Sequence, residues 1–110
     1  MSKRDVSITL RQMLDYSQKA VMLSKGRKRS DLDKDLTFSL AMTRLVEIIG
    51  EAVDRIPTDF QKEHPEIEWA QIVGMRNRLI HGYDEVDLNI LWSVVKRDIP
   101  VLIGQLEDLL

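Results

Sequence analysis

The chain has 110 residues, 44% hydrophobic and 31% charged, a balance typical of one globular domain spanning residues 1–110. It contains no cysteine and only two histidines, far apart in the sequence, which excludes disulfides and thiolate catalysis and argues against a metal site. No apolar run approaches the ~18 residues of a membrane span, so we expect a cytoplasmic protein with no membrane partner. The net charge of −2 is not that of a general nucleic-acid binder, so any contact to RNA must come from local patches.

The first half of the chain begins with a helix and a basic linker. Apolar residues at helical spacing predict a helix from about Asp5 to Ser24, with Gly26 just beyond it as a stop signal. A polar linker from Lys25 to about Asp33 follows. Its basic run Lys25–Arg29 is interpreted either as a solvated loop or as a local contact to RNA.

A second long helix is predicted from about Lys34 to Ile56, and Pro57 ends it. Its apolar stripe is wide, so we expect this helix to be central and buried on two sides. The segment Thr58–Gln61 has the form of a capping box, which predicts a short helical turn. Gly50, and Gly74 in the next helix, are expected to allow close helix–helix approach.

Two further helices complete the pattern. One is predicted to begin near Glu66–Trp69 and to continue through Ile80, with Gly82 as its stop. The last extends from about Asp87, its N-cap, to Leu109, and Pro100 should kink it or split it in two. The sequence therefore predicts an all-α fold, an antiparallel bundle of four or five helices, with enough aliphatic surface to suit a homodimer.

The candidate site is a motif of an arginine, four residues, a histidine, one residue and a tyrosine, from Arg76 through His81 to Tyr83. Arg76 and Arg78 provide planar, permanent cations that suit phosphate oxygens, and His81 can transfer a proton near neutral pH. These groups suffice to cleave a phosphodiester without a metal. His81 would assist attack by a ribose 2′-hydroxyl or protonate the leaving oxygen, Arg76 would stabilise phosphate charge, and Asn77 would orient imidazole or substrate.

The geometry of this motif leaves alternatives open. On a helix that continues through His81, Asn77 and Arg78 share a face with the histidine, whereas Arg76 points about 140° away. Arg76 could curl toward the helix end or meet the His81 of a second copy across a twofold interface, and the dimer explains the spacing better. The helix dipole favours imidazolium and the arginines oppose it, so the protonation state of His81 stays undetermined.

Several segments together carry a family resemblance. They are 47–52 (Glu-Ile-Ile-Gly-Glu-Ala), Pro65–Trp69, Ile72–Tyr83 and the stretch from Val86 to Pro100. In order and spacing they resemble HepT-like toxins of the HEPN superfamily, although Arg44–Val46 departs from the family's usual Arg-Asn-Leu. The resemblance implies a helical-bundle homodimer whose cleft lies between protomers. It also implies a metal-independent endoribonuclease that needs no cofactor, takes RNA as its substrate and is toxic to the host cell.

The resemblance also assigns roles within the motif. Arg76 and His81 match the catalytic pair, and Asn77 matches the polar residue beside the arginine. Tyr83 matches the tyrosine to which a cognate minimal nucleotidyltransferase antitoxin of the MNT type transfers AMP, and a bulky anion there would oppose RNA binding. Two alternatives remain. One is a non-catalytic module that binds a nucleotide, RNA or a nucleotidyltransferase, and the other is a structural dimer in which Arg76 and His81 only cap a helix.

Overall fold

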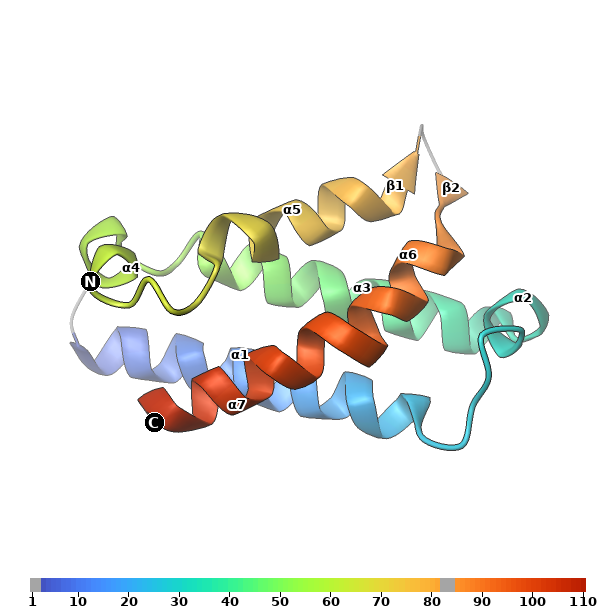
Figure 1. Cartoon of the computed structure of the whole chain (residues 1–110), viewed down its shortest axis with the longest axis horizontal. Helices are drawn as coiled ribbons and strands as arrows, with labels where there is room; N and C mark the ends of the chain where they lie inside the picture. The colour runs from blue at the N-terminus through green and yellow to red at the C-terminus, as the bar shows by residue number, and fades with distance from the viewer. Residues whose placement is uncertain (1–2, 82–84) are drawn as a thin grey trace.

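The computed structural model describes the backbone of residues 3–81 and 85–110 and the side chains of residues 5–79 and 85–110. Its long helices are α1 (Lys3–Ser24), α3 (Leu36–Val53), α5 (Trp69–Leu79) and α7 (Ile99–Leu109). They lie along the longest dimension of a body of 43 × 30 × 20 Å, and successive long helices run in opposite directions (Figure 1). The predicted all-α antiparallel bundle is therefore confirmed.

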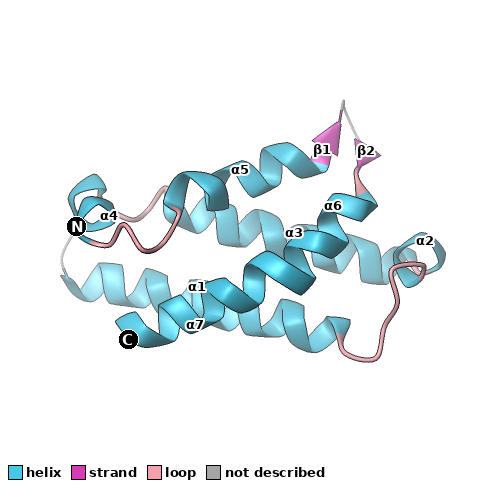
Figure 2. Cartoon of the chain, viewed as in Figure 1, coloured by secondary structure: helices cyan, strands magenta, loops and turns pink. Residues whose placement is uncertain are grey.

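Short elements connect the long helices. They are α2 (Asp31–Lys34), α4 (Thr58–Glu63), α6 (Leu88–Ser93), the π-helical turn η1 (Val94–Asp98) and the strands β1 (Ile80–His81) and β2 (Glu85–Val86). Figure 2 shows the two strands at one end of the molecule, between α5 and α6. No helix in the described part of the chain is long and apolar enough to cross a membrane.

Helix α3 is the centre of the core, as its wide apolar stripe predicts. It packs against α1 on one side and α5 on another, and α1 in turn packs against α7. Met42, Val46 and Ile49 of α3 are almost completely buried. Burying such a side chain stabilises the fold by about 1.5–3 kcal/mol, so α3 fixes the positions of the helices on either side of it.

The two glycines expected at close helix contacts differ. A Cβ added at Gly50 would lie 3.3 Å from the backbone oxygen of Ile72 and 4.0 Å from the Cβ of Arg76. The missing side chain therefore allows α5 to approach α3. A Cβ at Gly74 would meet no atom of the described residues within 4 Å. The expectation of close approach is confirmed for Gly50 and wrong for Gly74 within this chain.

Two helix beginnings differ from the prediction. Helix α3 begins at Leu36, because the carboxylate of Asp35 accepts the backbone N–H of Phe38 and so acts as its N-cap. The short helical turn predicted after Pro57 is confirmed as α4, but the capping box does not form, since no side-chain cap bond is made at its N-terminus. The amide of Gln61 instead donates to the backbone oxygen of Ile56 at 3.0 Å, where the chain leaving α3 has carbonyls that lack helical partners.

The helix that carries the motif ends earlier than predicted. Helix α5 stops at Leu79, and Ile80 and His81 pair antiparallel with Val86 and Glu85. The backbone N–H of Asp87 donates to the carbonyl of Leu79 at 2.6 Å, so the carbonyl at the end of α5 is satisfied by a residue eight positions further along the chain. The expected sharing of a helix face between His81 and its neighbours is therefore wrong, and the predicted stop at position 82 lies outside the described residues.

The last predicted helix is not split in two at Pro100: the chain stays helical from Leu88 to Leu109, and its regular α-helical bonding is interrupted just before the proline. Asp87 is its N-cap, because its carboxylate accepts the backbone N–H of Ile90 at 3.1 Å. Regular α-helix gives way to the π-helical turn η1, and α7 begins with Pro100 in its first turn. Proline has no N–H to bond the carbonyl of Lys96, and it fits readily at the start of a helix.

Candidate active site

Arg76 lies in the last turn of α5 on the flank that faces α3. Its Nη1 is 3.7 Å from Oε1 of Glu51, and Nη1 of Arg44 lies 3.3 Å from the same oxygen. One carboxylate therefore holds two guanidinium groups near each other. The Arg76 side chain is 41% exposed, and a guanidinium carries five N–H donors. Donors of Arg76 remain available for a phosphate group.

Arg78 lies on the opposite flank of the same helix. A residue two positions on points about 200° away around an α-helix, and Nη2 of Arg78 lies 3.5 Å from Oδ2 of Asp98 in η1. Asn77, between the two arginines, is exposed. The structure does not bring Arg76 and Arg78 to one side of α5. Within one protomer the two side chains therefore cannot bind the same phosphate group unless they change conformation.

The histidine of the motif lies in the strand that follows α5. The backbone of His81 lies in β1 opposite Glu85, two residues beyond the end of α5. The imidazole of His81 and the whole of Tyr83 lie outside the described residues. The motif is thus divided between a helix end and a strand, with Arg76 on the helical part.

The arginines of the basic linker are engaged within the chain. Nη2 of Arg27 lies 2.8 Å from Oδ2 of Asp35, and its guanidinium stacks on Phe38 at 4.1 Å from the ring centroid. Arg29 is 2.7 Å from Asp33, and its Nε donates to the side chain of Asn89 at 2.6 Å. These contacts favour a structural role for the linker arginines over a contact to RNA.

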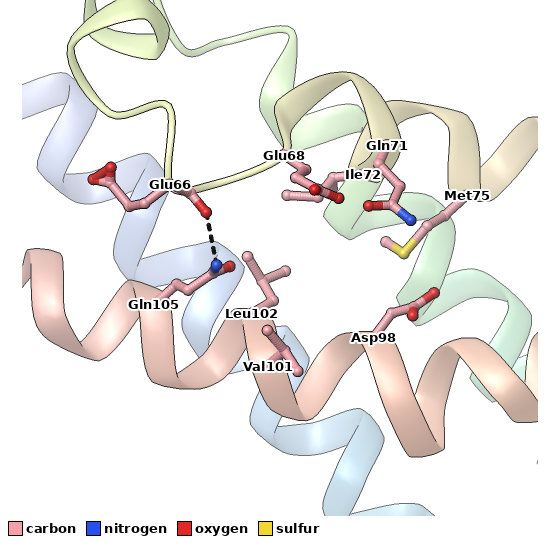
Figure 3. Close-up of a pocket in the computed structure, with 9 residues that line it drawn as sticks. All are labelled: Glu66, Glu68, Gln71, Ile72, Met75, Asp98, Val101, Leu102 and Gln105. Atoms are coloured by element: carbon pink, nitrogen blue, oxygen red, sulfur yellow. Dashed lines mark hydrogen bonds between the residues drawn. The ribbon is translucent and has the colours of Figure 1, made fainter.

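The hollow between α5 and α7 is lined by negatively charged side chains, in contrast to the cationic surroundings of Arg76 (Figure 3). It encloses about 280 Å³, and its lining includes Glu66, Glu68 and Asp98. The carboxyl of Glu66 has a lowered pKa, first because its own backbone N–H bonds to it and second because of His64, so it is ionised at neutral pH. Three carboxylates would repel a phosphate chain. Across the described ranges, no three His, Cys, Asp or Glu side chains are grouped to hold a metal ion.

Glu51 is the part of the site that sequence reasoning did not find. It lies in the stretch 47–52 that carries the resemblance, but it is not part of the motif from Arg76 to Tyr83. The signal that could have identified it is the seven-residue spacing from Arg44, which places both on one face of α3, two turns apart.

These features define a small all-α protein with a cationic flank at one helix end that suits a phosphate-bearing ligand. The chain belongs to the HepT-like ribonuclease family, whose sequence model matches residues 13–109.

Individual relatives agree with that assignment. The chain is 51% identical over 77 residues to a protein of Thermococcus cleftensis named "probable ribonuclease HepT", a match covering 70% of this chain and 68% of the relative. It is 36% identical over 107 residues to a "putative RNase" of Methanocaldococcus jannaschii, covering 97% and 98%. A "putative RNase" of Caldanaerobacter subterraneus is 40% identical over 86 residues, covering 78% and 77%. No solved structure matches the chain.

Proposed function

We propose that this protein is a metal-independent endoribonuclease and the toxin of a HEPN/MNT toxin–antitoxin pair. Membership of the HepT-like ribonuclease family supports cleavage of RNA. The observation that carries the proposal is the placement of Arg76, an accessible cation held by Glu51 at the end of the helix that leads into His81. An exposed guanidinium at that point is suited to the oxygens of a bound phosphodiester.

The chemistry follows from the two groups. His81 accepts the proton of a ribose 2′-hydroxyl as its oxygen attacks the neighbouring phosphorus, or donates a proton to the 5′-oxygen as the phosphorus–oxygen bond breaks. The products are a 2′,3′-cyclic phosphate and a 5′-hydroxyl. Arg76 stabilises the charge on the phosphate oxygens in the transition state. Asn77 and Arg78 assist by contacts to the substrate.

A homodimer supplies the remaining geometry in this proposal. A twofold axis near the end of α5 would set Arg76 of one protomer against His81 of the other, and each interface would form two equivalent clefts. Tyr83, two residues beyond His81, is the acceptor for AMP from the cognate nucleotidyltransferase antitoxin. The added phosphate brings negative charge next to the cleft and would repel RNA.

The deciding experiment is cleavage of pooled tRNA and mRNA by the purified protein in EDTA, beside His81→Ala. Intact mass must first establish that Tyr83 is unmodified. We expect cleavage without metal, and a loss of about 10²–10⁴-fold in His81→Ala, the usual value of a positioned proton-transfer group. Absence of cleavage by the folded, unmodified protein would contradict the proposal and favour a binding module.

The antitoxin step has its own test. Incubation with ATP and the cognate nucleotidyltransferase should add the mass of one AMP group and abolish cleavage, whereas Tyr83→Phe should gain no mass and remain active. Modification of Tyr83→Phe at the same rate would contradict the assignment of the acceptor and leave the ribonuclease proposal standing.

A further inference from the structure

A second hollow lies on the Arg76 side of the molecule, between α1 and α3. It encloses about 260 Å³ and is lined mainly by Gln12 and Tyr16 of α1, by Arg44, Ile48 and Glu51 of α3, and by Arg55 in the turn that follows α3. Glu51 both lines this hollow and pairs with Arg76. The hollow is therefore adjacent to the proposed catalytic residue Arg76, and the proposed chemistry gives it no role.

We propose that this hollow, the α1/α3 subsite, binds a nucleotide of the RNA that lies next to the two nucleotides joined by the cleaved bond. The inference rests on the proposed ribonuclease function and extends it to substrate binding. Its basis is the combination of two arginines, an aromatic ring and a side-chain amide in one hollow, together with Glu51, which lines the hollow and pairs with Arg76.

The charge of the α1/α3 subsite suits a phosphate chain. Arg44, Arg55 and Arg76 bring three positive charges to this region, and Glu47 and Glu51, which pair with Arg44, bring two negative charges. The region is thus positive by one charge, although the whole chain is negative by two. The Arg44 side chain is 59% exposed, so it can exchange part of its contact with carboxylates for a phosphate oxygen.

The other lining residues suit a base. Tyr16 is partly buried against the core, which holds its ring in a defined position. Nζ of Lys19 lies 5.2 Å from the centroid of that ring and 2.9 Å from Oδ2 of Asp15, so this ion pair adds no net charge to the subsite. Unpaired bases stack on aromatic rings of this kind, largely without regard to sequence. The amide of Gln12 offers both donors and an acceptor to a base edge.

The test measures binding of a labelled single-stranded RNA of mixed sequence to variants made in the non-cleaving His81→Ala background. Tyr16→Ala should lower the affinity about fivefold or more, the lower limit for loss of one stacked base. Arg44→Gln should reduce the slope of log affinity against log salt by about 0.7, the value of one phosphate contact. Arg11→Gln, which removes an exposed α1 cation outside the hollow, should change the slope at most marginally.

Conservative and structural controls separate binding from folding. Tyr16→Phe keeps the ring and should retain the affinity. The thermal midpoint and the mass in solution of each variant should match those of the parent. If Tyr16→Ala and Arg44→Gln instead change the oligomeric state, this face is a protein contact and the subsite proposal is overturned. Unchanged affinity in Tyr16→Ala together with an unchanged slope in Arg44→Gln overturns it as well.

Cleavage of two substrates distinguishes failure of the subsite from failure of the proposed function. In the active background, Tyr16→Ala should slow cleavage of a long RNA and leave cleavage of a dinucleotide unchanged, because a dinucleotide has no residue to place in the α1/α3 subsite. An equal loss on both substrates overturns the subsite. If the parent protein cleaves neither substrate but Tyr16→Ala still weakens RNA binding, the ribonuclease proposal fails, and the hollow stands as an RNA-binding site without a cleaved bond beside it.

Discussion

The two flanks of α5 carry arginines two residues apart, yet their surroundings have opposite charge. Arg76 faces α3, where it shares Glu51 with Arg44. Arg78 faces η1, where it pairs with Asp98 beside the carboxylate-lined hollow of Figure 3. A cation with a second cation beside it can attract a phosphate, whereas one that faces several carboxylates is largely neutralised. Neighbouring arginines in a motif therefore need not have equal roles.

The largest expected effect is the difference in cleavage rate between alanine substitutions of the two arginines. Arg76→Ala should lower kcat for RNA cleavage by about 10²–10³-fold, the usual loss when one donor to a developing oxyanion is removed. Arg78→Ala should lower it by less than about tenfold, because Arg78 contributes only a supporting contact. Cleavage rates at saturating RNA, with circular dichroism to check folding, make the comparison. A larger loss in Arg78→Ala would reverse the assignment of the two flanks.

Substitution of Gly50 tests whether the close packing of α5 on α3 is what places Arg76 beside Glu51. Gly50→Ala places a Cβ 3.3 Å from the carbonyl of Ile72, and backbone has little room to move, so the free energy of unfolding should fall by about 1–3 kcal/mol. The same substitution pushes α5 from α3 and should also reduce cleavage by moving Arg76 relative to Glu51. Urea unfolding and cleavage rates measure the two effects.

Gly74→Ala is the matched control. No described atom would lie within 4 Å of the new Cβ, so the gain in helix propensity should stabilise the protein by about 1 kcal/mol. Loss of stability in Gly74→Ala would mean that α5 is covered at this position by something outside the described chain, such as the second protomer.

Much of the fold could be predicted because the responsible interactions are local. Apolar spacing places the long helices, Asp87 caps the helix three residues before Ile90, and Pro100, which lacks an N–H, interrupts the regular α-helical bonding of the last helix. The end of α5 could not be predicted in this way. It depends on a bond between Leu79 and Asp87, which meet only after the chain has reversed direction.

The candidate site, too, could be predicted only where local sequence determines it. The identities of Arg76 and Arg78 are visible in the motif, but the direction of each side chain depends on how α5 is rotated against α3 and η1. That rotation follows from packing, including the contact that Gly50 permits. The role of Glu51 depends on the same contact. Helix periodicity alone separates the two arginines by about 200°, and only the fold says which neighbour each one meets.

The smallest expected effect concerns Arg27, whose guanidinium pairs with Asp35 and stacks on Phe38 within the chain, which makes it a reference for Arg76. Its hydrogen bond to Asp35, and next the backbone N–H of Phe38, lower the pKa of the Asp35 carboxyl. Because the pKa is lower in the folded state, this stabilisation is fully present above the ordinary aspartate pKa of about 3.9 and disappears as the pH falls through the depressed value. This pH dependence can be tested with Asp35→Asn, which keeps an oxygen for the cap but removes the charge.

The thermal midpoint of Asp35→Asn should therefore lie slightly below that of the parent at pH 7, and the difference between the two midpoints should disappear in acid. RNA cleavage at pH 7 should stay unchanged, since Arg27 is held by the fold and takes no part in the chemistry. A loss of cleavage in Asp35→Asn with the midpoint unchanged would place Arg27 with Arg76 among the RNA-binding cations.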